Sequence, residues 1–290
     1  MSRVFKQCLH WLGNAMALAG VVFVGYRFSI YRGQLDNFHD WWLVSGLALL
    51  SGISGVLLGC AWWLLLRGRL HDRVPTLSWA VLVYGISQLA KYLPGNIFHF
   101  ASRQALGMGA GLSSRVLLGS AFLELLMIAS AACGFALLVL PLLKVAPHLF
   151  AEGAFVLALL VVPTILWRMR GVDLSCVWLV HSLYLGLAAA VFCVLLCSVI
   201  EEAASPTFIL SCAGAYVLAW LAGLVIPGVP AGIGVREFVL LFLLKGIVVE
   251  ADLLLAVLLG RAVTTAGDCL YYLGSLIGMA VLKDVHHASR

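Results

Sequence analysis

The chain has 290 residues, of which 63% are hydrophobic and 11% are charged, and its mean hydropathy is +1.07. Water-soluble domains carry about 25% charged residues, so this composition excludes that class and predicts a polytopic membrane protein. The formal net charge of +5 is spread over the predicted loops and gives no case for nucleic-acid binding.

Six apolar segments are predicted to be full transmembrane helices, because a helical span needs about 20 apolar residues. In chain order they are residues 9–30, 41–66, 116–140, 149–167, 174–199 and 253–282. A transmembrane β-barrel would alternate apolar and polar residues, so the predicted fold class is all-α. The first segment lacks a small-residue cleavage site, and we interpret it as an anchor and not as a removed signal peptide.

Two further apolar regions, residues 78–112 and 207–247, are interrupted by YLPGN and by VIPGVPAGIGVRE. Each can form either one span with a loop or a re-entrant pair of half-helices. If both are re-entrant and the N-terminus is cytoplasmic, ten Lys and Arg residues lie on the cytoplasmic side and four on the other. If each region instead crossed the membrane once, the loops with the strongest charge bias would move to the opposite side of the membrane, against the positive-inside rule. We therefore predict six spans plus two re-entrant broken-helix hairpins, with both termini cytoplasmic.

The two interruptions share a pattern that predicts an internal repeat. A Pro-Gly pair at 94–95 is followed by Arg103, and a Pro-Gly pair at 227–228 is followed by Arg236, in each case nine residues after the proline. Each unit contains three predicted crossings, an odd number, so the second unit is predicted to be inverted. The predicted units are residues 10–140 and 143–282 of a single transmembrane domain, residues 1–290.

The breaks predict a polar cavity, because backbone groups freed by proline at membrane depth need protein or water partners. Arg261 and Asp268 share a face of the last helix, and Tyr272 continues that stripe. The residues predicted to bind substrate are Gln88, Lys91, Asn96, His99, Arg103, Arg236, Glu237, Arg261, Asp268 and Tyr272. The predicted hinge residues are Pro94, Gly95, Pro227, Gly228, Gly232 and Gly234.

A charge at the bilayer centre costs about 2.5–3.5 kcal/mol, so Arg103 and Arg236 are expected to face a cavity and to have a task there. The guanidinium fork suits phosphate. Lys91 could instead extend to the headgroup region, and His99 could be a packed core residue. The sequence leaves open whether acidic residues such as Asp268 pair with these arginines or carry protons. No metal or cofactor is predicted, and the eight cysteines are interpreted as small apolar packing residues.

In the stretches KYLPGNIFHFASR and GLVIPGVPAGIGVREFVLL, the chain resembles the transmembrane region of the lysylphosphatidylglycerol synthases and the related UPF0104-type flippase-like membrane proteins. The resemblance covers roughly residues 10–282. It implies a multi-pass protein of the bacterial inner membrane that translocates a lipid. These 290 residues match only the membrane region of the synthases and not their soluble aminoacyl-transferase domain, so we expect the resemblance to carry over lipid translocation and not lipid synthesis. The usual Pro-Gly-Gly-Leu-Gly form is altered here, and kinship suggests a polyprenyl-phosphate or glycolipid substrate.

Three functions are therefore considered. The first is a flippase for an anionic lipid with a phosphate or diphosphate headgroup. The second is a non-catalytic membrane subunit of a glycosyltransferase or another envelope-polymer assembly complex. Gly55 and Gly59 lie four residues apart and permit close helix contacts with a partner or in a homodimer. The third is an integral-membrane lipid-phosphate transferase, although no ligand set or catalytic triad is recognisable; we expect translocation and not enzymatic chemistry.

Overall fold

The computed structural model describes residues 40–70, 74–93, 97–200, 204–226, 232 and 234–288. All regular secondary structure in these ranges is helical, apart from an isolated bridge between Lys245 and Val248. The helices, in chain order, are α3 (Trp41–Arg67), α4 (Leu77–Gln88), η1 (Leu89–Tyr92), α5 (Phe98–Gly109), α6 (Ser114–Ala136), η2 (Leu137–Val139), α7 (His148–Arg170), α8 (Val172–Val199), α9 (Pro206–Val225), α10 (Val235–Leu243) and α11 (Glu250–Ala288).

Within the described residues, six helices are long and apolar enough to cross a membrane, which indicates a multi-pass membrane protein. They are α3, α6 with η2, α7, α8, α9 and α11 as far as Leu282. Five of them confirm predicted spans. The remaining predicted span, residues 9–30, lies outside the described residues. The sixth long helix, α9, occupies the first half of the interrupted region 207–247.

Side-chain caps and special turn residues define several helix ends. Thr76, Ser113 and Ser205 each accept a hydrogen bond from a backbone N–H three residues further on, which satisfies one free donor of the following helix. Pro206 begins α9, where its missing N–H costs nothing. Between α7 and α8, Gly171 has a φ of 87°, a conformation that suits glycine and allows the chain to reverse in one residue.

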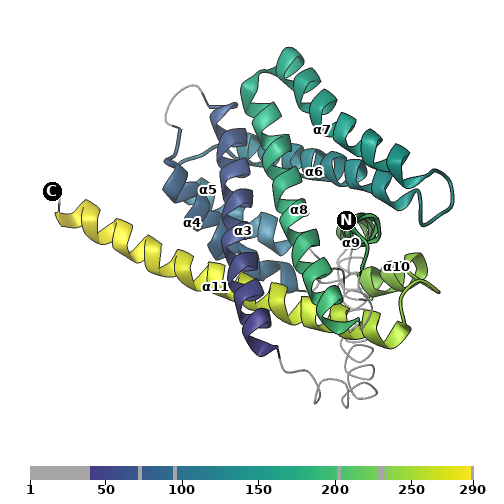
Figure 1. Cartoon of the computed structure of the whole chain (residues 1–290). Coiled ribbons are helices and arrows are strands. Elements are labelled where there is room, and N and C mark those ends of the chain that lie inside the picture. The colour runs from purple at the N-terminus through teal and green to yellow at the C-terminus, as the bar shows by residue number, and fades with distance from the viewer. Residues whose placement is uncertain are drawn as a thin grey trace, which may run out of the picture.

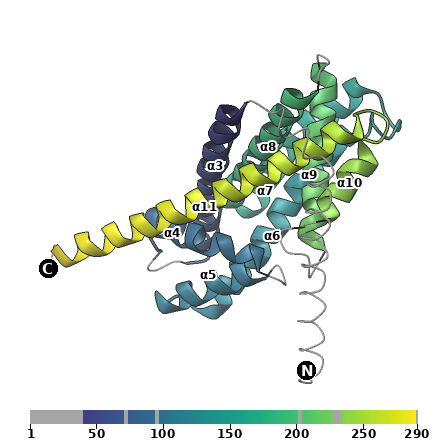
Figure 2. The same ribbon diagram turned by 90° about the horizontal axis from the view of Figure 1, so that it is seen from below.

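The helix α11 packs against α3, α4, α8 and α10. In Figure 1 it runs diagonally past α3 and α8, and Figure 2 shows its C-terminal part extending beyond α4 and α5. Where it crosses α3, a Cβ placed on Gly267 would lie 2.8 Å from the amide nitrogen of Gly52. Two helices can approach this closely only because both positions are glycine.

Helices α3 and α8 are antiparallel neighbours. An ion pair joins Arg67, the last residue of α3, to Asp173 in the first turn of α8. The main hydrophobic core lies along these helices and α6, and it includes Trp62 and Trp178, which are 2% and 1% exposed. The N-terminal end of α8 therefore lies on the same side of the bundle as the C-terminal end of α3.

A short helix follows each of the two interruptions. The helix α5 has 12 residues and α10 has nine, well below the roughly 20 residues of a span. α5 packs against α4, and α10 packs against α9. The Pro-Gly pairs themselves, residues 94–95 and 227–228, lie outside the described residues. The two short helices bring residues from both interruptions into the interior of the bundle.

Candidate functional site

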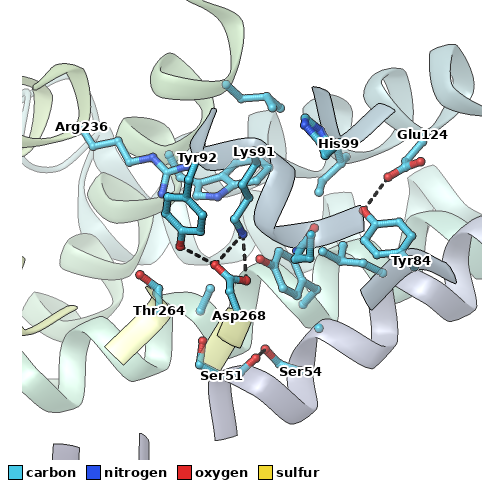
Figure 3. Close-up of a pocket in the computed structure, with 18 of the residues that line it drawn as sticks. Ser51, Ser54, Tyr84, Lys91, Tyr92, His99, Glu124, Arg236, Thr264 and Asp268 are labelled. Carbon is cyan, nitrogen blue, oxygen red and sulfur yellow. Dashed lines mark hydrogen bonds and ion pairs between the residues drawn. The ribbon is translucent and has the colours of Figure 1, made fainter. Parts of the chain in front are cut away.

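A polar cavity of about 110 Å³ lies among the helices, at the place where the two short helices meet α3, α6, α8 and α11. This volume has room for several water molecules, and a polar lining in such a setting favours water over an empty space. Figure 3 shows side chains from both interrupted regions pointing into it. Its polar lining residues are Ser51, Ser54, Tyr84, Gln88, Lys91, Tyr92, His99, Glu124, Tyr184, Tyr216, Arg236, Arg261, Thr264 and Asp268.

Lys91 and Asp268 form an ion pair on one wall of the cavity. The Lys91 ammonium lies 2.8 Å from Oδ2 of Asp268, and the Tyr92 hydroxyl donates a hydrogen bond of 2.5 Å to the same carboxylate (Figure 3). The two side chains are only 23% and 14% exposed. Lys91 therefore reaches inward to a largely buried carboxylate, and its ammonium is part of the cavity lining.

A second ion pair joins Arg103 of α5 to Glu124 of α6. Arg103 Nη1 lies 2.8 Å from Oε2 of Glu124, and the two side chains are 4% and 6% exposed. The Tyr84 hydroxyl donates to Oε1 of the same carboxylate at 2.7 Å, and its ring lies 4.1 Å below the guanidinium carbon. Glu124 lines the cavity, whereas Arg103 lies directly behind it. The charge of Arg103 is thus neutralised inside the protein.

A third ion pair, between Arg261 of α11 and Glu237 of α10, stabilises the second interruption. Arg261 Nε donates to Oε1 of Glu237 at 2.8 Å, and its Nη2 donates to the carbonyl oxygen of Gly232 at 3.1 Å. The other oxygen of Glu237 accepts a hydrogen bond of 2.6 Å from the Gly234 N–H, at the start of α10. The N-terminal end of α10 is therefore capped by the protein's own carboxylate.

Arg236 differs from these cations. Within the described part of the chain it makes no ion pair with a carboxylate. Its buried Nε has no hydrogen-bond partner, which is also true of Nη1 and Nη2 of Arg103, but Arg103 has the charge of Glu124 beside it. Its side chain passes between Gly223 and Gly232, where an added Cβ would lie 2.9 Å from the arginine in each case, and its guanidinium carbon lies 5.7 Å from the Trp220 ring. The glycines make room for an arginine that points into the cavity (Figure 3).

An apolar groove of about 260 Å³ lies beside the cavity on the same helices, α3, α4 and α11. Tyr271 lines this groove. Its hydroxyl donates to the Val81 carbonyl at 2.7 Å, and its ring packs so closely on Gly55 and Gly85 that an added Cβ would lie 2.7 and 2.9 Å away. Because Gly55 lines the cavity and Tyr271 lines the groove, the two spaces lie on neighbouring parts of the same helices.

The structure brings most of the predicted substrate-binding residues together. Gln88, Lys91, His99, Arg236, Arg261 and Asp268 line the cavity. Arg103 and Glu237 reach it through their ion-pair partners. Tyr272 is not a lining residue: the lining part of α11 consists of Arg261, Thr264 and Asp268, and the next residue on that face, Tyr271, lines the apolar groove. Of the predicted hinge residues, Gly232 and Gly234 adopt positive φ angles of 69° and 88°. Asn96, Pro94, Gly95, Pro227 and Gly228 lie outside the described residues.

The lining tyrosines were missed in the sequence. Tyr84, Tyr92, Tyr184 and Tyr216 all line the cavity, and two of them donate to its carboxylates. The available signal was their position inside otherwise apolar segments, since a buried tyrosine hydroxyl needs a hydrogen-bond partner. Ser51, Ser54 and Thr264 gave a weaker signal, because such hydroxyls commonly bond to their own helix backbone.

The described residues contain no cluster of three or more His, Cys, Asp or Glu side chains arranged to hold a metal ion. The lining groups are instead cations, carboxylates and hydroxyls, which can bind an anion through charge-assisted hydrogen bonds. No protein-family model matches the chain, and the comparison with curated proteins finds no match.

Proposed function

We propose that this chain is a flippase that moves an anionic lipid, with a phosphate or diphosphate headgroup, across the membrane. The observation that carries the proposal is Arg236, a cation without a carboxylate partner among the described residues, which points into a polar cavity inside a bundle of apolar helices. A charge at that depth costs several kcal/mol when it has no partner, so its retention favours a ligand of opposite charge.

The apolar groove beside the cavity supports a lipid substrate and not a free phosphate. A lipid presents an anionic head and apolar chains that are covalently joined, and the two neighbouring spaces have these two polarities. The headgroup is proposed to enter the cavity while its chains stay in the groove and the surrounding bilayer. The resemblance to flippase-like proteins supports the same substrate class, with polyprenyl-linked lipids and glycolipids as candidates.

The order of the helices supports the proposed inverted repeat. Adding the 133-residue offset between the Pro-Gly pairs carries α3 onto α8, α4 onto α9, α5 onto α10 and α6 onto the first part of α11. In this scheme the broken regions α4–α5 and α9–α10 are the two re-entrant hairpins, which enter from opposite sides. Alternate opening of the hairpins would expose the cavity to one face of the membrane and then to the other.

The proposal is tested with purified protein in vesicles that contain fluorescent phosphatidylglycerol, using a membrane-impermeant quencher to measure its movement between leaflets. We expect R236Q to lower the translocation rate at least about tenfold, the effect of losing roughly 1.4 kcal/mol of headgroup binding. Glutamine at this position keeps a polar side chain and leaves no carboxylate without its partner. The matched control is R115Q, because Arg115 lies exposed in the first turn of α6, away from the cavity.

Equal rates for R236Q and the unchanged protein would contradict the headgroup assignment. Absence of translocation by the unchanged protein, together with loss of a partner glycosyltransferase when the chain is deleted, would favour the accessory-subunit alternative. Formation of a new lipid product by the purified protein alone would favour the transferase alternative.

A further inference from the structure

The charges around the cavity are almost balanced by the protein itself. Four cations and three carboxylates line the cavity or pair directly with a lining residue. The cations are Lys91, Arg103, Arg236 and Arg261, and the carboxylates are Glu124, Glu237 and Asp268. With His99 neutral, this group of described residues carries a net charge of +1.

The three carboxylates are unavailable as exchangeable counter-ions, because each is bound on more than one side. Glu124 accepts from Tyr84 as well as pairing with Arg103, and Asp268 accepts from Tyr92 as well as pairing with Lys91. Glu237 likewise binds both Arg261 and the Gly234 N–H. Displacement of any one of them would leave a buried carboxylate without partners, which is strongly unfavourable.

We infer that the cavity selects a lipid headgroup with one net negative charge, a phosphodiester without a positive substituent, over a diphosphate. The inference rests on the proposed function, because it concerns the substrate of the same site. One negative charge on the ligand makes the occupied cavity neutral. A second negative charge finds no further cation among the described lining residues to balance it in a low-dielectric interior, where mismatched charges cost far more than in water.

Binding is measured with purified protein by native mass spectrometry and three lipids that share dioleoyl chains. Phosphatidylcholine has no net charge, phosphatidylglycerol has one negative charge, and diacylglycerol diphosphate has at least two. We expect phosphatidylglycerol to bind at least about tenfold more tightly than either of the other two. Equal or tighter binding of the diphosphate would overturn the inference while leaving an anionic lipid as the substrate. Equal binding of all three lipids would overturn the proposed function as well.

A charge variant supplies a test that a structural effect would not imitate. D268N raises the net charge of the cavity to +2 and frees the Lys91 ammonium, so the preference is expected to move toward diacylglycerol diphosphate by about tenfold relative to phosphatidylglycerol. The matched control is D173N, which removes the carboxylate of the Arg67 ion pair at the end of the bundle. That change is expected to leave the lipid preference unaltered.

E237Q provides a second route if D268N folds poorly. Its side-chain oxygen can still accept from the Gly234 N–H, and it too raises the net charge to +2. The preference for the diphosphate is expected to rise as in D268N. An unchanged ratio of affinities in a folded D268N or E237Q protein would overturn the inference, because selection by net charge requires the ratio to change.

Discussion

At the scale of single residues, the ion pair between Arg103 and Glu124 is the most deeply buried charged contact among the described residues. Both side chains are almost fully removed from solvent, and Tyr84 completes the cluster from the side of α4. A buried ion pair contributes little net stability compared with apolar residues of similar size, but the loss of one partner leaves the other charge buried alone. The pair is therefore expected to respond very differently to single and double substitution.

We predict that R103L lowers the free energy of unfolding by about 3–5 kcal/mol, because Glu124 then lacks its cation. The double variant R103L/E124L should recover a large part of that loss. The measurement is the unfolding of purified protein in mixed detergent micelles as the fraction of denaturing detergent rises. A double variant less stable than R103L would show that the two charges do not act as a pair.

At the scale of whole helices, the packing of α3 on α11 depends on glycine. A Cβ on Gly52 would lie 2.8 Å from the carbonyl oxygen of Gly267, which is backbone and cannot turn away. By contrast, a Cβ on Gly46, six residues earlier in α3, would have no atom within 4 Å. The same helix therefore offers a close-contact glycine and an open one.

We predict that G52A destabilises the protein by about 1–3 kcal/mol, since the added methyl group forces the two helices apart. G46A should be neutral or slightly stabilising, because alanine favours the helix by up to about 1 kcal/mol relative to glycine. Both variants are compared by the same unfolding measurement. If G46A and G52A have equal stability, the helices do not cross at Gly52.

The apolar groove can be filled without disturbing its walls. A Cβ on Gly274 would have no atom within 4 Å, so leucine can occupy the groove from α11. We predict that G274L lowers lipid translocation at least about threefold while leaving the unfolding midpoint nearly unchanged, since surface substitutions usually stay within about 0.5 kcal/mol. G153L is the control, because Gly153 of α7 is equally open and far along the chain from the groove. Full activity of G274L would contradict a role for the groove.

At the scale of the whole molecule, the ends of the long helices fall into two groups. The ion pair of Arg67 with Asp173 places the α3–α4 and α7–α8 connections at one end of the bundle. At the other end, Ile200 and Phe208 pack with Leu244 in one apolar cluster, which joins the α8–α9 and α10–α11 connections. Among the described residues, Arg67, Arg115, Arg168 and Arg170 lie at the first end, so by the positive-inside rule we predict that this end faces the cytoplasm.

We predict that single cysteines placed at Arg115 and Arg170 react from the cytoplasmic side, whereas those at Ser205 and Lys245 react from the opposite side. The measurement uses a membrane-impermeant thiol reagent on intact and opened cells, in a chain whose native cysteines have been replaced. A reagent that reaches all four positions from the same side would refute this orientation.

The sequence predicts the long helices well and the site only in part. An uninterrupted run of apolar residues is sufficient to locate a helix, and the predicted segment 174–199 differs from α8 by two residues at its start. The ion pairs of the site, however, join residues that are far apart in the sequence. Lys91 and Asp268 are 177 residues apart, and their contact depends on how α11 crosses the bundle. Tyr271 and Tyr272 both lie about one turn from Asp268, so the sequence spacing could not show that Tyr272 stays out of the cavity while Tyr271 lines the apolar groove.

The close contact between Gly52 of α3 and Gly267 of α11 defines the natural pivot for any tilt of α11 against α3. If α11 tilts about Gly267, each of its side chains moves by an amount proportional to its distance from Gly267 along the helix axis. Arg261 is six residues from Gly267, about 9 Å along the axis, whereas Asp268 is one residue away, about 1.5 Å. A tilt of α11 would therefore lengthen the ion pair between Arg261 and Glu237 more than the ion pair between Asp268 and Lys91. The cavity would open first beside α10.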